Sequence, residues 1–129
     1  MPDKSRVRAF IDTVVSGRHV EAVQNFYHDD ASMQENLQPA RRGLTALVEH
    51  EIASLQRIQS MHTHPVETFL IDGDHALIRW TFDIVDKAGA SRRLEELALQ
   101  RWRGDRIAEE QFFYDTATAW RPIEAAKAG

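Results

Sequence analysis

The residues from Arg92 to Asp115 constrain the fold more than any other part of the chain, because they alternate like two strands joined by a tight turn. Gly104 can take the positive φ that such a reversal needs. Every second residue of the first arm shares one face: Leu94, Glu96, Ala98, Gln100 and Trp102. Both faces of both arms mix carboxylates with large apolar groups, whereas a simple core sheet is apolar on one face only. We therefore expect one face to line a cavity and the other to meet a partner.

Helical spacing of apolar residues predicts three helices earlier in the chain. The first runs from Lys4 and ends at Gly17, and a shorter second helix buries Val20, Val23, Phe26 and Tyr27. A third runs from about Leu44 to about Gln59, with an apolar stripe of Leu44, Leu47, Val48, Ile52, Leu55 and Ile58.

Strand-like segments fill the rest of the chain. A short strand is expected at 31–36, a second at 61–71 and a third at 75–85, followed by the hairpin at 92–115 and a helical turn at 116–120. Pro65 places the second strand at an edge or a bulge. Helices grouped early and an antiparallel meander late predict an α+β fold. At 129 residues, the whole chain (1–129) is expected to form one domain.

Composition excludes several classes of function. With 16 basic and 20 acidic residues and a net charge of −4, nucleic acid is not an expected partner. The absence of cysteine removes disulfides, thiolate metal sites and a cysteine nucleophile. No segment approaches the length of a membrane span. We expect a cytoplasmic protein.

The order of elements resembles the nuclear-transport-factor-2-like superfamily, which includes SnoaL-like cyclases, ketosteroid isomerase and limonene epoxide hydrolase. The resemblance lies in FYHDDASMQEN (26–36), PARRGLTALVEHE (39–51), DGDHALIRWTFDIV (72–85) and QRWRGDRIAEEQFFYD (100–115). It implies helices packed in the concave side of a strongly curved, mostly antiparallel sheet, a cystatin-like cone. The cone would hold a small apolar molecule, and its convex face would form a homodimer.

The resemblance also implies which residues face the pocket. Glu35 falls at the isomerase's catalytic aspartate and, with Glu110, is a candidate catalytic residue. The expected pocket wall comprises Phe10, Val14, Trp80, Phe82, Glu96, Ala98, Gln100, Phe112 and Tyr114. Leu97, Leu99 and Phe113 would lie on the convex, dimerising face.

The specific chemistries of these relatives do not carry over. The isomerase's two donors to the enolate oxygen look like Phe10 and Ala98, neither of which can donate from its side chain. The epoxide hydrolase's tyrosine and asparagine look like Met33 and Glu35. Its arginine and two aspartates look like Trp80, Phe82 and Phe112.

Glu35 is the first candidate base. In an apolar cone its carboxylate would lose hydration and bind a proton more readily, as a general base requires. Glu35 could instead point out of the cone mouth or pair with Arg41 or Arg42.

Glu96 and Glu110 lie on adjacent arms and could share a proton or hold a cationic ligand. Alternatively, they could pair with Arg79 or Arg101. Glu95 and Glu109, on the convex side, would serve an interface through arginine pairs.

His62 and His64 lie on one side of a strand and could bind a metal with a nearby carboxylate. No third ligand follows at a regular spacing, so we interpret them as surface histidines and expect no metal and no cofactor.

Two functions remain open from the sequence. One is a cofactor-independent isomerase, cyclase or hydratase with Glu35 as the general base. The other is a non-catalytic ligand-binding or dimerisation module, which the missing enolate donors favour.

Overall fold

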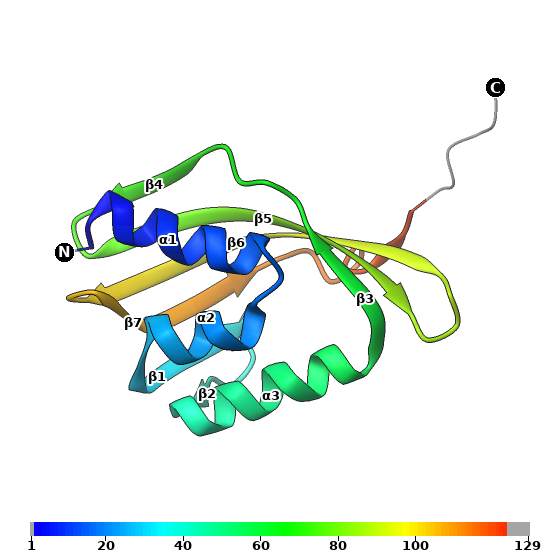
Figure 1. Cartoon of the computed structure of the whole chain (residues 1–129), viewed down its shortest axis with the longest axis horizontal. Helices are drawn as coiled ribbons and strands as arrows, with labels where there is room; N and C mark the ends of the chain where they lie inside the picture. Colours follow the sequence, from blue (N-terminus) through cyan, green and yellow to red (C-terminus); the bar gives the residue numbers. More distant parts are fainter. Residues whose placement is uncertain (1, 124–129) are drawn as a thin grey trace.

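The computed structural model describes residues 2–123, which form three helices against one curved sheet of eight strands (Figure 1). The helices are α1 (Lys4–Val15), α2 (His19–Phe26) and α3 (Leu44–Gln56). The longer strands are β1 (Tyr27–Glu35), β3 (Ile58–Thr63), β5 (His75–Asp86), β6 (Ser91–Arg103) and β7 (Arg106–Phe113). The shorter strands are β2 (Arg41–Arg42), β4 (Phe69–Asp72) and β8 (Arg121–Pro122).

The strands follow the order β2-β1-β7-β6-β5-β3, with β4 also pairing with β5 and β8 with β6. Every pairing is antiparallel except that of β1 with β7, which is parallel. The helices lie against one side of the sheet (Figure 1). The predicted α+β fold, with helices in the concave side of a strongly curved, mostly antiparallel sheet, is therefore confirmed.

The β6–β7 hairpin has the predicted turn and the predicted faces. Gly104 has a φ of 65° at the reversal, a conformation open to glycine because it lacks Cβ. Gln100 pairs with Glu110, and Ala98 pairs with Phe112. Alternate residues of β6 are buried, whereas Leu99 between them is 38% exposed. The alternation in the sequence therefore correctly predicts which residues of β6 and β7 share a face.

The predicted strand at 61–71 is wrong as a single element. The structure has β3 and β4, which pair with different parts of β5 and are separated by residues 64–68. Pro65 lies in that gap, where a residue without a backbone N–H interrupts no ladder. Strand pairing also begins earlier than expected at Ile58, and α3 accordingly ends at Gln56 rather than at Gln59.

Two smaller boundaries also differ. Tyr27, expected on the second helix, is the first residue of β1 and remains buried. Residues 116–120 form turns rather than a regular helix, and they lead into β8.

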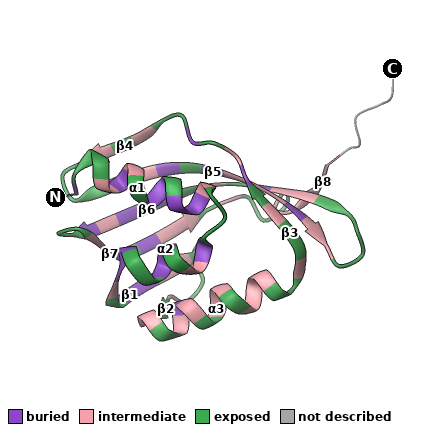
Figure 2. Cartoon of the chain, viewed as in Figure 1, coloured by how far each residue is buried: buried purple, intermediate pink, exposed green. Residues whose placement is uncertain are grey.

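The core is the interface between the concave sheet face and the helices, where the buried residues gather (Figure 2). Phe10 of α1 lies at its centre, in edge-to-face contact with Phe26, Tyr27, Trp80 and Trp102 at 5.5–6.3 Å between ring centroids. Each such contact contributes about 0.5–1.5 kcal/mol beyond area burial. This cluster packs α1 against the sheet.

None of the helices within residues 2–123 is long and apolar enough to cross a membrane.

Candidate active site

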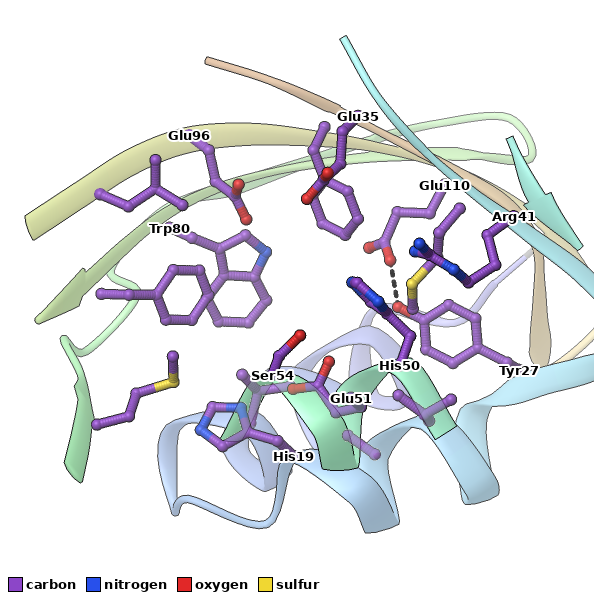
Figure 3. Close-up of a pocket in the computed structure, with 18 of the residues that line it drawn as sticks. His19, Tyr27, Glu35, Arg41, His50, Glu51, Ser54, Trp80, Glu96 and Glu110 are labelled. Carbon is purple, nitrogen blue, oxygen red and sulfur yellow. Dashed lines mark hydrogen bonds between the residues drawn. The ribbon is translucent and has the colours of Figure 1, made fainter. Parts of the chain in front are cut away.

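A cavity of about 470 Å³ lies between the concave sheet face and the helices (Figure 3). Glu96, Glu35 and Glu110 project into it from the sheet, while His19, His50, Glu51 and Ser54 come from the helices (Figure 3). Its walls are completed by Phe10, Val14, Ala22, Val23, Tyr27, Met33, Gln38, Pro39, Arg41, Met61, Trp80, Phe82, Leu94, Phe112 and Trp120. The lining is thus largely apolar, with four carboxyl groups.

Three of the residues predicted to line the pocket do not. Ala98 is fully buried in the core and does not reach the cavity lining. Gln100 is also fully buried and turns toward Glu110. Tyr114 lies just beyond β7, where its backbone N–H donates to Oδ1 of Asn36. The other predicted wall residues, and both predicted catalytic glutamates, do line the cavity.

Glu110 is the most enclosed acid of the cavity, with 3% of its surface exposed. The Tyr27 hydroxyl donates to its Oε1, and Nε2 of Gln100 donates to its Oε2 at 2.6 Å. Burial raises the pKa of Glu110 to about 7, although both hydrogen bonds favour the charged form. Near neutral pH, both the protonated and the charged form of Glu110 are therefore populated.

Glu96 has a half-buried carboxyl group facing the same cavity. Burial, reinforced by the charges of Glu110, Glu35 and Glu51, raises its pKa to about 8. Burial also raises the pKa of Glu51. Neither Arg79 nor Arg101 forms an ion pair with Glu96 or Glu110 in residues 2–123. Arg101 instead bonds the convex Glu109 at 3.0 Å. A pKa of about 8 favours the protonated form of Glu96 at neutral pH.

Glu35 does not have the environment expected for the base. It lines the cavity but is an exposed residue, at the end of β1. The predicted loss of hydration is therefore wrong, because β1 carries Glu35 to the solvent-accessible rim. No ion pair joins Glu35 to Arg41 or Arg42 within the described chain, although Arg41 also lines the cavity.

The sequence interpretation missed the polar face of α3. His50, Glu51 and Ser54 face the cavity, while Ile52, assigned to the buried stripe, is 40% exposed. Leu47 is the one fully buried residue of α3, and Glu51 and Ser54 follow it at i+4 and i+7. That spacing places all three on one helix face. The helical spacing of Glu51 from the apolar residue Leu47 was the sequence feature that could have predicted this polar face.

Both histidines of the cavity bind a proton less readily than a free imidazole does. Burial lowers the pKa of His19 and of His50, and Arg41 lowers that of His50 further. The guanidinium of Arg41 is therefore the one permanent positive charge among the described residues that line the cavity.

His62 and His64 lie outside this cavity. Their rings are 5.3 Å apart, but Nε2 of His64 is 2.6 Å from Oδ2 of Asp83. In residues 2–123 no group of three or more His, Cys, Asp or Glu is arranged to hold a metal ion.

Solved structures resemble this fold. One is a proposed SnoaL-like polyketide cyclase from Mesorhizobium loti, which is 21% identical, with 88% of this chain and 100% of that chain covered and a TM-score of 0.73. A second, from Catenulispora acidiphila, has a ketosteroid isomerase-like fold and was crystallised with trimethylamine. It is 18% identical over 92% of this chain and 91% of that chain, with a TM-score of 0.74.

A third similar structure is an LEH-like epoxide hydrolase from M. tuberculosis. It is 14% identical, with 91% of this chain and 85% of that chain covered and a TM-score of 0.70. No curated protein matches the chain. The family model of the SnoaL-like domain matches residues 7–110. The chain therefore belongs to the SnoaL-like family of the nuclear-transport-factor-2-like superfamily.

Proposed function

We propose that this protein is a cofactor-independent acid–base catalyst that isomerises, cyclises or hydrates a small, largely apolar molecule. The observation that carries the proposal is the position of Glu110, a buried carboxyl group in the wall of a mostly apolar cavity. A base works best when its pKa lies near the working pH, and burial brings the pKa of Glu110 to about 7.

Glu110 and Glu96 take complementary roles in this proposal. The Glu110 carboxylate removes a proton from the carbon next to a carbonyl group, and the electron pair of that C–H bond moves onto the carbonyl oxygen. Glu96, protonated at neutral pH because its pKa is about 8, gives its proton to that oxygen. When a C=C bond adjoins the carbon that lost its proton, Glu110 returns that proton to the far carbon of the double bond while the oxygen gives its proton back to Glu96, which completes an isomerisation. Glu35, at the rim, helps to position the ligand.

Two of the similar structures support a chemical role, since one is an epoxide hydrolase and another a proposed polyketide cyclase. The apolar rings of the wall, Phe10, Trp80, Phe82 and Phe112, suit an apolar ligand. We also propose that the protein is cytoplasmic, and its composition without cysteine is compatible with that location.

Exchange of α-hydrogens tests the base without knowledge of the natural substrate. Cyclohexanone is incubated with the protein in D₂O at neutral pH, and loss of the α-hydrogen signal is followed by NMR. Glu110→Gln should lower the protein-dependent rate about 10²-fold or more, because it removes the base. Glu109→Gln is the matched control, since Glu109 is the exposed neighbour on the convex face.

The same assay separates the two candidate bases. If Glu35→Gln removes the exchange while Glu110→Gln keeps it, the assignment of Glu110 is wrong. Exchange no faster with the wild-type protein than in buffer, across a series of small cyclic ketones, would favour the non-catalytic function.

That second function is a ligand-binding or dimerisation module, and the convex face of the sheet favours it. Leu97, Leu99 and Phe113 are 42%, 38% and 40% exposed, and Leu97 pairs with Phe113 across β6 and β7. We propose that a second copy of the chain covers this apolar strip. The neighbouring Arg101–Glu109 and Arg121–Glu95 pairs form within the chain and would rim the interface.

A further inference from the structure

A chain of hydrogen bonds runs from Trp102 and Gln100, which lie behind the cavity wall, to Glu110 and Tyr27, which line the cavity. Nε1 of Trp102 donates to Oε1 of Gln100 at 3.0 Å, and Nε2 of Gln100 donates to Oε2 of Glu110 at 2.6 Å. The Tyr27 hydroxyl bonds the other carboxyl oxygen, Oε1. All four side chains are at most 3% exposed. The three bonds therefore lie out of reach of bulk water.

Trp102 determines which way the Gln100 amide points. An indole N–H can only donate, so it requires the amide oxygen of Gln100 opposite it. The amide nitrogen must then face Glu110, and it too can only donate. The assignment of the amide thus follows from the chemistry of the indole.

This arrangement favours one place for a proton on Glu110. Gln100 already donates to Oε2 at 2.6 Å, and a proton on Oε2 would make that oxygen a poorer acceptor for the Gln100 N–H. A proton on Oε1 faces the Tyr27 oxygen, which can accept as well as donate. When Glu110 is charged, Tyr27 donates to it; when Glu110 is neutral, Glu110 donates to Tyr27.

The second state frees the hydrogen of the Tyr27 hydroxyl. Tyr27 lines the cavity (Figure 3), so this hydrogen can turn toward a ligand. We infer that Trp102 and Gln100 act as positioning residues for the Glu110–Tyr27 pair, and that Tyr27 donates a hydrogen bond to an acceptor oxygen of the ligand once Glu110 holds a proton.

The inference rests on the proposed function and deepens it. After Glu110 has taken the proton from carbon, the new O–H of Glu110 turns toward the Tyr27 oxygen, and the hydrogen of the Tyr27 hydroxyl turns toward the oxygen on which negative charge develops. Donors aimed at developing charge are strong contributors to catalysis. The ligand class is thereby narrowed to small, largely apolar molecules with an acceptor oxygen, such as ketones.

Other charged groups face this pair from the elements packed around it. Burial is the largest cause of the raised pKa of Tyr27, followed by the charge of Glu110, and Glu51 of α3 and Glu96 of β6 add to it. Burial also raises the pKa of Glu110 most, and Glu51 adds to it. Nη1 of Arg106 on β7 donates to the backbone carbonyl of Tyr27 at 3.1 Å. On the cavity side lie Glu35, Arg41, His19 and His50.

The test is an NMR titration of the ligand-free protein labelled with carbon-13 at Glu Cδ and Tyr Cζ. Glu110→Gln and Tyr27→Phe assign the two resonances. The Tyr27 Cζ signal should move with the same midpoint as Glu110 Cδ, near pH 7. In Gln100→Met the midpoint should rise by about one pH unit, because the carboxylate loses one charge-assisted hydrogen bond. In Trp102→Phe the Glu110 midpoint should also rise, because the side-chain amide of Gln100 can then rotate and turn its oxygen toward Glu110.

Ile78→Val is the matched control, since it removes buried volume from the same sheet but touches none of the three bonds. Its midpoint should equal that of the wild-type protein. A Tyr27 signal that stays still while Glu110 titrates overturns the relay. The positioning role of Trp102 and Gln100 is overturned if the Glu110 midpoint is unchanged in both Gln100→Met and Trp102→Phe. It is also overturned if Ile78→Val shifts that midpoint by as much as those variants do.

Activity gives a separate readout. Tyr27→Phe should slow cyclohexanone exchange by about 10-fold or more while Glu110 still titrates. An unchanged exchange rate in that variant overturns the donor role of Tyr27. A coupled titration in a protein without any exchange activity would uphold the relay and count against the catalytic proposal alone.

Discussion

Glu110 and Glu109 are adjacent in sequence, yet they occupy opposite chemical environments. Glu110 is 3% exposed on the concave face and bonds Tyr27 and Gln100, whereas Glu109 is exposed and pairs with Arg101 at 3.0 Å. Burial raises the pKa of Glu110, and Arg101 lowers that of Glu109. A strand places successive side chains on opposite faces, so one position along β7 separates a candidate base from a surface ion pair.

Glu96 should make the protein less stable as the pH rises. Its pKa is about 8 in the folded protein against about 4.5 when unfolded. The folded state therefore holds the proton more tightly. The stability from this group is complete below about pH 4.5 and is lost as the pH rises toward 8.

Glu96→Gln should therefore be more stable than the wild-type protein at pH 8, by about 1–3 kcal/mol, and of similar stability at pH 4.5. Urea unfolding at both pH values measures this. Glu95→Gln, which changes the exposed neighbour, should show no such gain at pH 8; an equal gain would contradict the assignment to the cavity.

Asp83 should stabilise the fold at neutral pH. Arg93 holds it with two bonds of 2.7 and 3.0 Å, and His64 adds a third of 2.6 Å, so its pKa lies well below its usual range. The folded state favours the charged form, and this stability is present above about pH 4 and lost as the pH falls below it. Asp83→Asn should cost about 1–3 kcal/mol at pH 7 by urea unfolding. Its cost should shrink at pH 3, and a constant cost would exclude a charge effect.

The charge of Glu51, on α3, should raise the titration midpoints of Glu110 and Glu96, the two residues proposed as base and acid. Its charge raises the pKa of both Glu110 and Glu96. Glu51→Gln should therefore lower both titration midpoints, measured by carbon-13 NMR of the carboxyl carbons. Glu49→Gln, on the exposed side of the same helix, should leave them in place. Unchanged midpoints in Glu51→Gln would show that the charge of Glu51 does not affect the pKa of Glu110 or of Glu96.

The proposed dimer can be disrupted at one residue. Leu99→Asp places a charge in the centre of the convex apolar strip, where its desolvation would oppose association. Sedimentation at micromolar concentration should give a dimer for the wild-type protein and a monomer for the variant. Leu37→Asp is the control, because Leu37 is 88% exposed elsewhere on the chain, and it should remain dimeric. A monomeric wild-type protein would contradict the proposal.

The sequence alone determined which residues of each strand share a face, and those faces include much of the cavity wall. Alternation in β6 and β7 grouped Glu96 with Ala98 and Glu110 with Phe112, because the side-chain period of a strand is fixed at two residues. The resemblance then identified these faces as the concave ones. Three helices and a curved, mostly antiparallel sheet followed from apolar spacing together with the resemblance. These features are local or repeat regularly, so a linear pattern carries them.

Tertiary structure decided which carboxyl group is enclosed. Glu35 follows the strand pattern as well as Glu110 does, but β1 ends at Glu35, where solvent reaches it, whereas Glu110 lies under Tyr27 and beside Gln100. The contact of Tyr27 with Glu110 joins residues 83 positions apart, and no local spacing encodes it. Hydration and hydrogen bonding depend on neighbours in space, so the protonation of each glutamate is a property of the fold.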